Sequence, residues 1–339
     1  MVSYLLLTPL IISFIITLFL IPIWIRRAKN AGIAGRDVHK TSDALIAESG
    51  GVNVLVGFVF SVLIYVAIQT FYYESTANIL EILALISVVL MASFIGFVDD
   101  ILGWKIGLNK RSRLLLLIFV SIPLMAINAG KDLITIPFIG QVELGFIYPL
   151  ILIPLGIVGA TSTYNFLAGF NGLEAGQGII ILIATAIVLY FGGYSWLALV
   201  ALCMVMALFA FLLFNFYPAK IFPGDSLTYA LGSLIAVLAI LGSFERVAVF
   251  FFTPYIIEVF LKLRGRLVKQ SFAKKMPDGS LDLQYPQVYS LNHVAIWTMK
   301  KIGVRPTERK VVFWVWGFQI LVIILGFIIF RNGIFEYSS

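Results

Sequence analysis

Ten long apolar stretches dominate the sequence and limit what it can fold into. Hydrophobic residues make up 61% of the 339 residues and charged residues only 12%, which is more apolar surface than a soluble core requires. A helix of roughly 20 apolar residues crosses a hydrocarbon layer about 30 Å thick. We therefore predict an all-α polytopic membrane protein with about ten transmembrane helices. They lie at about residues 3–25, 51–72, 78–98, 114–128, 146–164, 177–192, 195–214, 226–242, 247–263 and 311–330.

The placement of Lys and Arg predicts how these helices are oriented. With ten spans, the segments that follow the odd-numbered spans carry 21 of the 24 Lys and Arg residues. Because basic residues accumulate on the cytoplasmic side of membrane proteins, that side is predicted to be cytoplasmic and both termini to lie outside. The net charge of +7 follows from the same bias and also suits anionic headgroups or substrates.

The chain reads as one membrane-embedded domain, residues 1–339, with short excursions. The outer segment at about 129–145 alternates apolar and polar residues and predicts a small hairpin. The cytoplasmic loop at about 264–310 contains Pro277-Asp278-Gly279, which predicts a turn between two strands. After it, Asn292–Lys301 predicts an amphipathic helix on the membrane surface, with His293 near the headgroups.

Asp99 and Asp100 end the third apolar stretch at its cytoplasmic edge. Two adjacent carboxylates at a membrane boundary are costly unless a cation or a basic partner neutralises them. Neighbouring helical residues point about 100° apart, so the two side chains are expected to have different roles. The alternative is a solvated helix end, although acidic groups oppose the dipole at a helix C-terminus.

Amide, carboxylate and aromatic side chains gather in two further cytoplasmic loops. Asn165 and Asn171 lie in a loop with glycines and no basic residue, and amide oxygens can bind a hard cation or pair with a base edge; a plain Gly-Asn turn is the alternative. Asp225 opens the eighth span, either as an N-cap or as a metal ligand. Phe222 before it could stack on a base.

Basic residues surround these groups. Asp37, His39, Lys40 and Glu48 lie in the first cytoplasmic loop, and Arg264, Arg266, Lys269 and Gln270 precede the predicted hairpin. Basic clusters suit diphosphates, with ordinary solvated faces as the alternative. Carboxylates with amide oxygens favour Mg²⁺, or Mn²⁺, over zinc. A phosphoryl-transfer site with a divalent cation is therefore predicted, and no nucleic-acid partner is expected.

These motifs stand in a consistent order over nearly the whole chain and resemble the polyprenyl-phosphate N-acetylhexosamine-1-phosphate transferase superfamily (MraY/WecA-like). The likeness is closest to its branch that acts on dolichyl phosphate, in an archaeal type. The pieces that carry it are Asp37–Ser42 with Glu48–Gly51, Gly96–Asp100, Asn165–Gln177, Asn215–Pro218 with Phe222–Asp225, and Thr307–Lys310.

The resemblance implies a reaction and its partners. The expected enzyme transfers N-acetylglucosamine-1-phosphate from UDP-N-acetylglucosamine to dolichyl or another polyprenyl phosphate and releases UMP, in a cytoplasmic groove. This is the first step of lipid-linked oligosaccharide synthesis for protein N-glycosylation. The membrane would be the plasma membrane in an archaeon or the endoplasmic reticulum in a eukaryote, and a homodimer is possible. Alternatives are another UDP-N-acetylhexosamine, or a transporter, for which Glu258 in the ninth span is the notable midplane charge.

The resemblance also implies roles for single residues. Asp99 would act at the lipid phosphate as a base or an organiser, with Asp100 supporting the metal region. The metal and diphosphate would be held by Asn165 and Asp225, uracil by Asn171 and Phe222, and the sugar and diphosphate surroundings by Glu48, Arg266 and Lys269. Two positions depart from the family: His39 replaces an Asn, and Arg113 stands where a phosphate-binding Lys is usual, with Lys110 as the other candidate.

Overall fold

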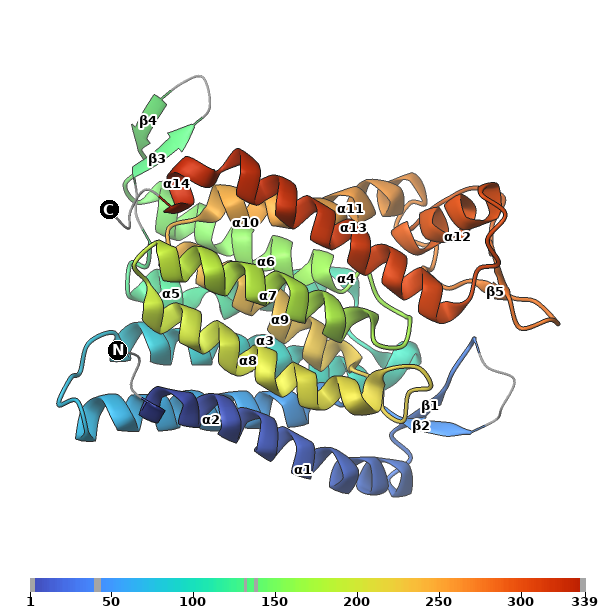
Figure 1. The fold of residues 1–339 in the computed structure, drawn as a ribbon, viewed down its shortest axis with the longest axis horizontal. Coiled ribbons are helices and arrows are strands. Elements are labelled where there is room, and N and C mark those ends of the chain that lie inside the picture. The colour runs from blue at the N-terminus through green and yellow to red at the C-terminus, as the bar shows by residue number, and fades with distance from the viewer. Residues whose placement is uncertain (1–3, 40–43, 131–132, 137–139, 336–339) are drawn as a thin grey trace.

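The long apolar segments form a bundle of roughly aligned helices (Figure 1). The computed structural model describes residues 4–39, 44–130, 133–136 and 140–335. Within these, seven helical segments are long and apolar enough to cross a membrane, which confirms the multi-pass helical class. They are η1 with α1 (Tyr4–Leu7 and Thr8–Asn30), α2 (Gly51–Phe71), α3 (Ile79–Ile106), α7 (Leu173–Phe191), α8 (Ser195–Asn215), α9 (Gly224–Leu241) and α13 (Glu308–Ile329).

The other three predicted spans are each divided into two shorter elements. Residues 114–128 form α4 (Lys110–Val120) and α5 (Ile122–Ala126), residues 146–164 form the π-helix η2 (Tyr148–Leu152) and α6 (Ile153–Tyr164), and residues 247–263 form α10 (Glu245–Phe251) and α11 (Thr253–Arg264). Each second element carries a proline in its first turn, where the missing N–H is tolerated but the helix before it is interrupted. The count of ten spans and the orientation of the termini stay predictions.

Helix α9 runs through the middle of the bundle (Figure 1). Of its apolar window 83% is buried, against 22% for α1 at the periphery. Glycines bring its neighbours close: a Cβ on Gly96 of α3 would lie 2.4 Å from the Asp225 backbone, and one on Gly232 of α9 would lie 2.6 Å from the Ala160 carbonyl oxygen of α6. Small residues allow such close helix packing. The start of α9 is thereby held directly beside the end of α3.

Three small antiparallel hairpins lie at the two ends of the helices. Strands β3 (Leu133–Ile136) and β4 (Gly140–Glu143) confirm the hairpin predicted at about 129–145, and β5 (Lys274–Lys275) pairs with β6 (Leu281–Asp282) around the predicted turn. The pair β1 (Ala34–Arg36) and β2 (Leu45–Ala47) was not predicted. In Figure 1, β3, β4 and α14 (Arg331–Phe335) lie at one end, and β1, β2 and β5 at the other.

The predicted helix after the long loop is present as α12 (Leu291–Lys301), but His293 does not face the headgroups. Its side chain is fully buried. The imidazole Nδ1 accepts the Tyr289 N–H at 3.2 Å, and Nε2 lies 2.9 Å from the Phe272 carbonyl oxygen. The expectation for His293 is therefore wrong, because α12 packs against α11 and α13 and turns this face inward.

Candidate active site

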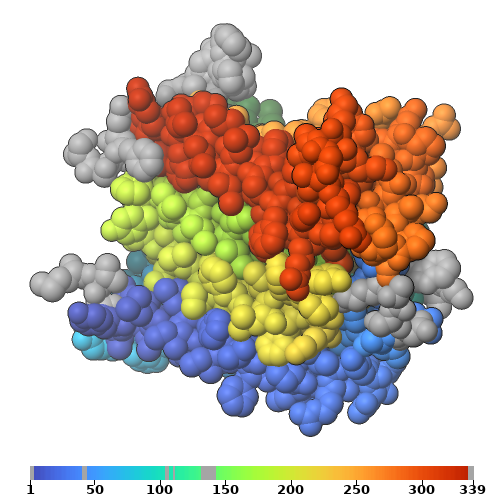
Figure 2. All heavy atoms as spheres, turned by 45° about the vertical axis from the view of Figure 1, so that its right-hand side comes forward, coloured from blue at the N-terminus to red at the C-terminus, as the bar shows by residue number. Residues whose placement is uncertain are grey.

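Three adjoining hollows of about 280, 410 and 470 Å³ form a groove near β1, β2 and β5. The first and second share Asn165, the first and third share Asp225, and the second and third share Arg113. Figure 2 brings that end forward, with the orange region around α12 above, yellow residues in the middle and the blue amino-terminal segments below. The groove thus collects side chains from segments far apart in the sequence.

Asp99 and Arg113 meet across the turn between α3 and α4. Gly103, with φ +65°, leaves the helical conformation, so the chain curls back and the Leu108 N–H reaches Asp99 Oδ1 at 2.7 Å. The other carboxylate oxygen pairs with the Arg113 guanidinium, which also lies 3.9 Å from Asp225 Oδ2. Arg113 therefore bridges two carboxylates, with one nitrogen of its guanidinium fork toward each of them. The side chain of Lys110, the other candidate, lies outside the described residues.

Asp100 holds the first turn of α9. Its Oδ1 accepts the Asp225 N–H at 2.7 Å and its Oδ2 accepts the Ser226 N–H at 3.3 Å. Free N–H groups at a helix start favour such a carboxylate. The N-cap interpretation of Asp225 is wrong, since Asp225 lies inside the first turn and Pro223 occupies the cap without a side-chain bond. The capping carboxylate comes from another helix, and the Asp225 side chain is left for the groove.

Asn165 and Asp225 line the same hollow. Asn165 follows the last residue of α6, and its Oδ1 lies 3.1 Å from the Thr228 hydroxyl, which is 3.2 Å from the Asp225 carbonyl oxygen. Thr228 is one helical turn after Asp225, so this spacing was a usable signal that the sequence reasoning missed. Carboxylate and amide oxygens beside one guanidinium form a donor set that fits a hard divalent cation.

Asn171 is buried and fixed by two carboxylates. Its Nδ2 donates to Asp37 Oδ2 at 2.9 Å, and its backbone N–H donates to Glu308 Oε1 at 2.8 Å. With His39, these two acids bring possible ligand atoms within 4.8 Å of one another. However, Asp37 Oδ1 also accepts the His39 N–H, and His39 Nε2 accepts the Ala273 N–H. The cluster is therefore better explained as the support of Asn171 than as a metal centre.

His39 joins the segment between α1 and α2 to the rest of the groove. Its ring centre lies 4.5 Å from that of Phe170 and 5.8 Å from that of Phe272. Burial lowers the pKa of His39 to about 4, with smaller effects from Asp37 and Lys275. A neutral imidazole is what the Ala273 N–H requires as its acceptor.

The remaining predicted residues differ in their placement. Phe222 and Glu48 both line the first and third hollows; Glu48 is half-buried, and burial raises the pKa of its carboxyl. Lys269 lines the second hollow with its ammonium 4.6 Å from the centre of the Tyr285 ring. Arg266 is exposed at φ +54° and is not among the described residues that line these three hollows.

The fold and the groove define a multi-pass helical membrane protein with an acidic, cation-compatible site at one end of its bundle. Residues 82–243 match the family described as glycosyl transferase family 4. The chain is 34% identical over 329 residues, 95% of its length and 96% of the relative's, to a Saccharolobus solfataricus protein. That protein carries the provisional name UDP-N-acetylglucosamine–dolichyl-phosphate N-acetylglucosaminephosphotransferase. The chain belongs to glycosyl transferase family 4.

Two further relatives show how wide the likeness is. A Dictyostelium discoideum protein with the same enzyme name, given without qualification, is 30% identical over 72% of this chain and 68% of its own length. A phospho-N-acetylmuramoyl-pentapeptide-transferase of Halalkalibacterium halodurans is 30% identical over 76% of this chain and 81% of its own length. The resemblance drawn from the sequence motifs is thus confirmed at the level of the family.

Proposed function

We propose that this chain transfers N-acetylglucosamine-1-phosphate from UDP-N-acetylglucosamine to dolichyl or another polyprenyl phosphate, with release of UMP. The observation that carries the proposal is the bridge that Arg113 makes between Asp99 and Asp225 at one end of apolar helices. A lipid phosphate has to react at such a boundary, because its tail stays in the hydrocarbon layer. The names of the relatives that align along most of the chain support the choice of donor and acceptor.

The reaction is a single displacement. An oxygen of the lipid phosphate attacks the β-phosphorus of the donor, the bond from that phosphorus to the bridging oxygen breaks, and UMP leaves with the electron pair. Arg113 neutralises charge between acceptor phosphate and Asp225, while Asp99 acts as a base or as an organiser of the acceptor phosphate. The chain's contribution is alignment and charge neutralisation, on which phosphoryl transfer mainly depends.

The donor's two ends would be held by different parts of the groove. Asn171 and Phe222 would recognise uracil, and Glu48 with Lys269 would surround the sugar and diphosphate. Asn165 and Asp225 would hold Mg²⁺, or Mn²⁺, which when bound stabilises charge on the leaving oxygen. The oxygen donors around Asn165 and Asp225 support this assignment.

We further propose that the groove faces the cytoplasm, with both termini outside. The 21 of 24 Lys and Arg residues in the segments on the groove's side support this orientation. The reaction would then begin lipid-linked oligosaccharide assembly for N-glycosylation, at the plasma membrane of an archaeon or the endoplasmic reticulum of a eukaryote.

The test is UMP release by the purified chain in detergent with magnesium, dolichyl phosphate and UDP-N-acetylglucosamine. Lipid-dependent and metal-dependent UMP supports the proposal, and Asp225→Ala should reduce it by at least about a hundredfold. Glu81→Ala, in the first turn of α3 at its other end, is the matched acidic control and should stay active. UMP release with UDP-N-acetylgalactosamine but not with UDP-N-acetylglucosamine would assign a different donor sugar. Near-normal activity of Asp225→Ala would refute the metal assignment.

Transport of a nucleotide sugar or a lipid-linked sugar is the competing function, and the environment of Glu258 counts against it. Its carboxylate is fully buried and accepts the Leu291 N–H at 2.6 Å. A carrier charge would be expected to face a path across the membrane. Glu258 is instead committed to the start of α12.

A further inference from the structure

One wall of the groove is an irregular segment between α11 and α12, residues 269–273. Lys269, Gln270, Ser271 and Phe272 all line the second hollow, and Phe272 lines the first as well. The backbone of 269–272 belongs to neither a helix nor a strand. The position of this wall therefore depends on the contacts that side chains make with it.

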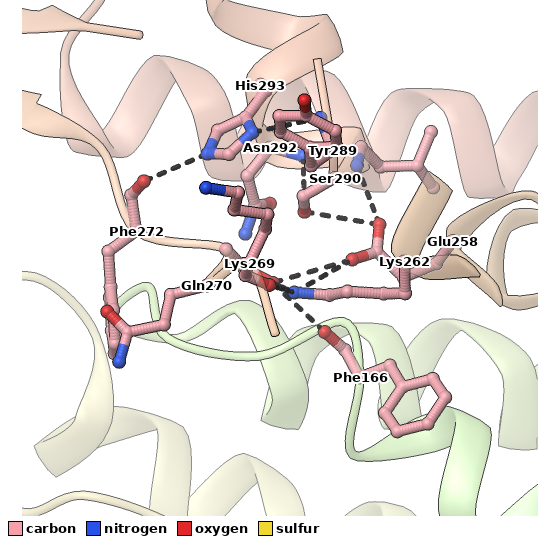
Figure 3. A network of polar contacts seen from close by, with 12 residues as sticks. Phe166, Glu258, Lys262, Lys269, Gln270, Phe272, Tyr289, Ser290, Asn292 and His293 are labelled. Atoms are coloured by element: carbon pink, nitrogen blue, oxygen red, sulfur yellow. Dashed lines mark hydrogen bonds and ion pairs between the residues drawn. The ribbon is translucent and has the colours of Figure 1, made fainter. Parts of the chain in front are cut away.

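Lys262 of α11 forms hydrogen bonds with the first residues of that segment (Figure 3). Its ammonium nitrogen donates to the Lys269 carbonyl oxygen at 3.1 Å and to the Ser271 hydroxyl at 2.5 Å. It is 8% exposed, and Glu258, one turn earlier on α11, places Oε1 3.7 Å away. The carboxylate neutralises the buried ammonium and leaves its protons directed at the segment.

Ser271 connects the segment to the loop that follows α6. Its hydroxyl donates to the Phe166 carbonyl oxygen at 3.1 Å, and Phe166 directly follows Asn165 of the proposed metal site. The other oxygen of Glu258 accepts the Leu291 N–H at 2.6 Å and the Ser290 hydroxyl at 3.2 Å. One buried ion pair thus connects α11, the start of α12, the 269–273 segment and the residue next to Asn165.

We propose that Glu258 and Lys262 are positioning residues that set the 269–273 segment against the Asn165 loop and so determine the fit of the nucleotide-sugar donor. This inference rests on the proposed function. Asp99, Asp100 and Asp225 belong to α3 and α9 and, among the described residues, make no hydrogen bond to the segment. Loss of the Lys262 contacts should therefore weaken donor binding and leave the chemical step largely intact.

The experiment compares the thermal midpoint, the donor KM, kcat and direct UDP binding for variants of the full chain in detergent. Lys262→Met and Glu258→Gln each leave a buried charge without its partner, so both should lower the midpoint. The double variant E258Q/K262M removes both charges and should recover much of the midpoint. It still lacks the donor to Lys269 and Ser271, so its donor KM and UDP dissociation constant should stay raised by about tenfold.

Two serines provide the matched pair. Ser271→Ala removes the bridge to Phe166 without burying a lone charge, and it should raise the donor KM several-fold, by roughly three to ten times, with kcat near normal. Ser290→Ala removes the hydroxyl that donates to the Glu258 carboxylate from the start of α12. Among the described residues this hydroxyl makes no hydrogen bond to the 269–273 segment, so its loss should leave the donor KM near the wild-type value.

The outcomes separate a positioning role from a merely structural one. Recovery of both the midpoint and the donor KM in the double variant would overturn the proposal, as would an unchanged donor KM in Lys262→Met or a change confined to the lipid KM. An inactive wild-type chain that still binds UDP more tightly than Lys262→Met would count against the proposed function alone.

Discussion

The Asp100 carboxylate accepts the backbone N–H of Asp225 at 2.7 Å, across 125 positions of sequence. The capped turn belongs to α9, the most buried of the candidate spans. The two adjacent acids near the end of α3 therefore have different roles. Asp99 pairs with Arg113, and Asp100 fixes the start of the helix that carries Asp225. This division satisfies the expectation that neighbours about 100° apart on a helix have different roles.

Asp100→Ala should lower both stability and turnover. Two N–H groups at the start of α9 would lose their acceptor, which costs about 1–3 kcal/mol of unfolding free energy. Without this acceptor the first turn of α9 moves and displaces the Asp225 side chain, which should reduce kcat by at least about tenfold. Asp100→Asn keeps an oxygen acceptor and should lose less stability. Thermal unfolding and UMP release measure both effects, and equal stability of the wild type and Asp100→Ala would contradict the capping role.

Arg113→Met should abolish the bridge between Asp99 and Asp225, and Arg113→Lys should restore only part of it. An ammonium keeps the charge but lacks the planar fork whose two nitrogens face the two carboxylates. We expect a loss of about a hundredfold or more in kcat/KM for the Met variant and roughly tenfold for Lys. Arg111→Met, an exposed neighbour on the same helix, is the control. A fully active Arg113→Met would show that another cation binds the phosphate.

Gly224→Ala should reduce UMP release more than Gly193→Ala, although both glycines have a positive φ. Gly224 has φ +71°, and a Cβ there would lie 2.2 Å from Asp100 Oδ2. Gly193 has φ +83° with open space around it, so its alanine variant carries backbone strain alone, about 1–2 kcal/mol. Both variants should unfold at lower temperature, and only Gly224→Ala should lose most of its UMP release. Equal activities would argue against the clash with Asp100.

His39 should make the fold acid-sensitive. Its pKa is about 4 in the folded chain against an ordinary value of 6.5, so between these values the unfolded chain binds a proton that the folded chain does not. The contribution of neutral His39 to the free energy of unfolding is therefore fully present above about pH 6.5 and is lost as the pH falls toward 4. His39→Asn removes this titration and should flatten the fall in thermal midpoint. Identical pH profiles for the two proteins would contradict the prediction.

Local patterns determined much of what the sequence could predict. The apolar stretches predicted the helices, Pro277-Asp278-Gly279 predicted the β5–β6 turn, and nine of the ten residues predicted for the site line the groove. Each of these signals acts within a few residues: burial of an apolar run, the backbone preference of a turn, or the cost of a carboxylate at a membrane edge.

Only the tertiary structure decided which of these groups meet. The N-cap reading of Asp225 failed because the cap is supplied by Asp100 of another helix, and His293 is buried because α12 turns that face toward α11 and α13. Arg266 is exposed, while Lys269 is carried to the groove by Lys262 and Ser271. Long-range hydrogen bonds and ion pairs carry no periodic signal along a chain, because their partners are brought together by helix packing, so residue type alone cannot assign them.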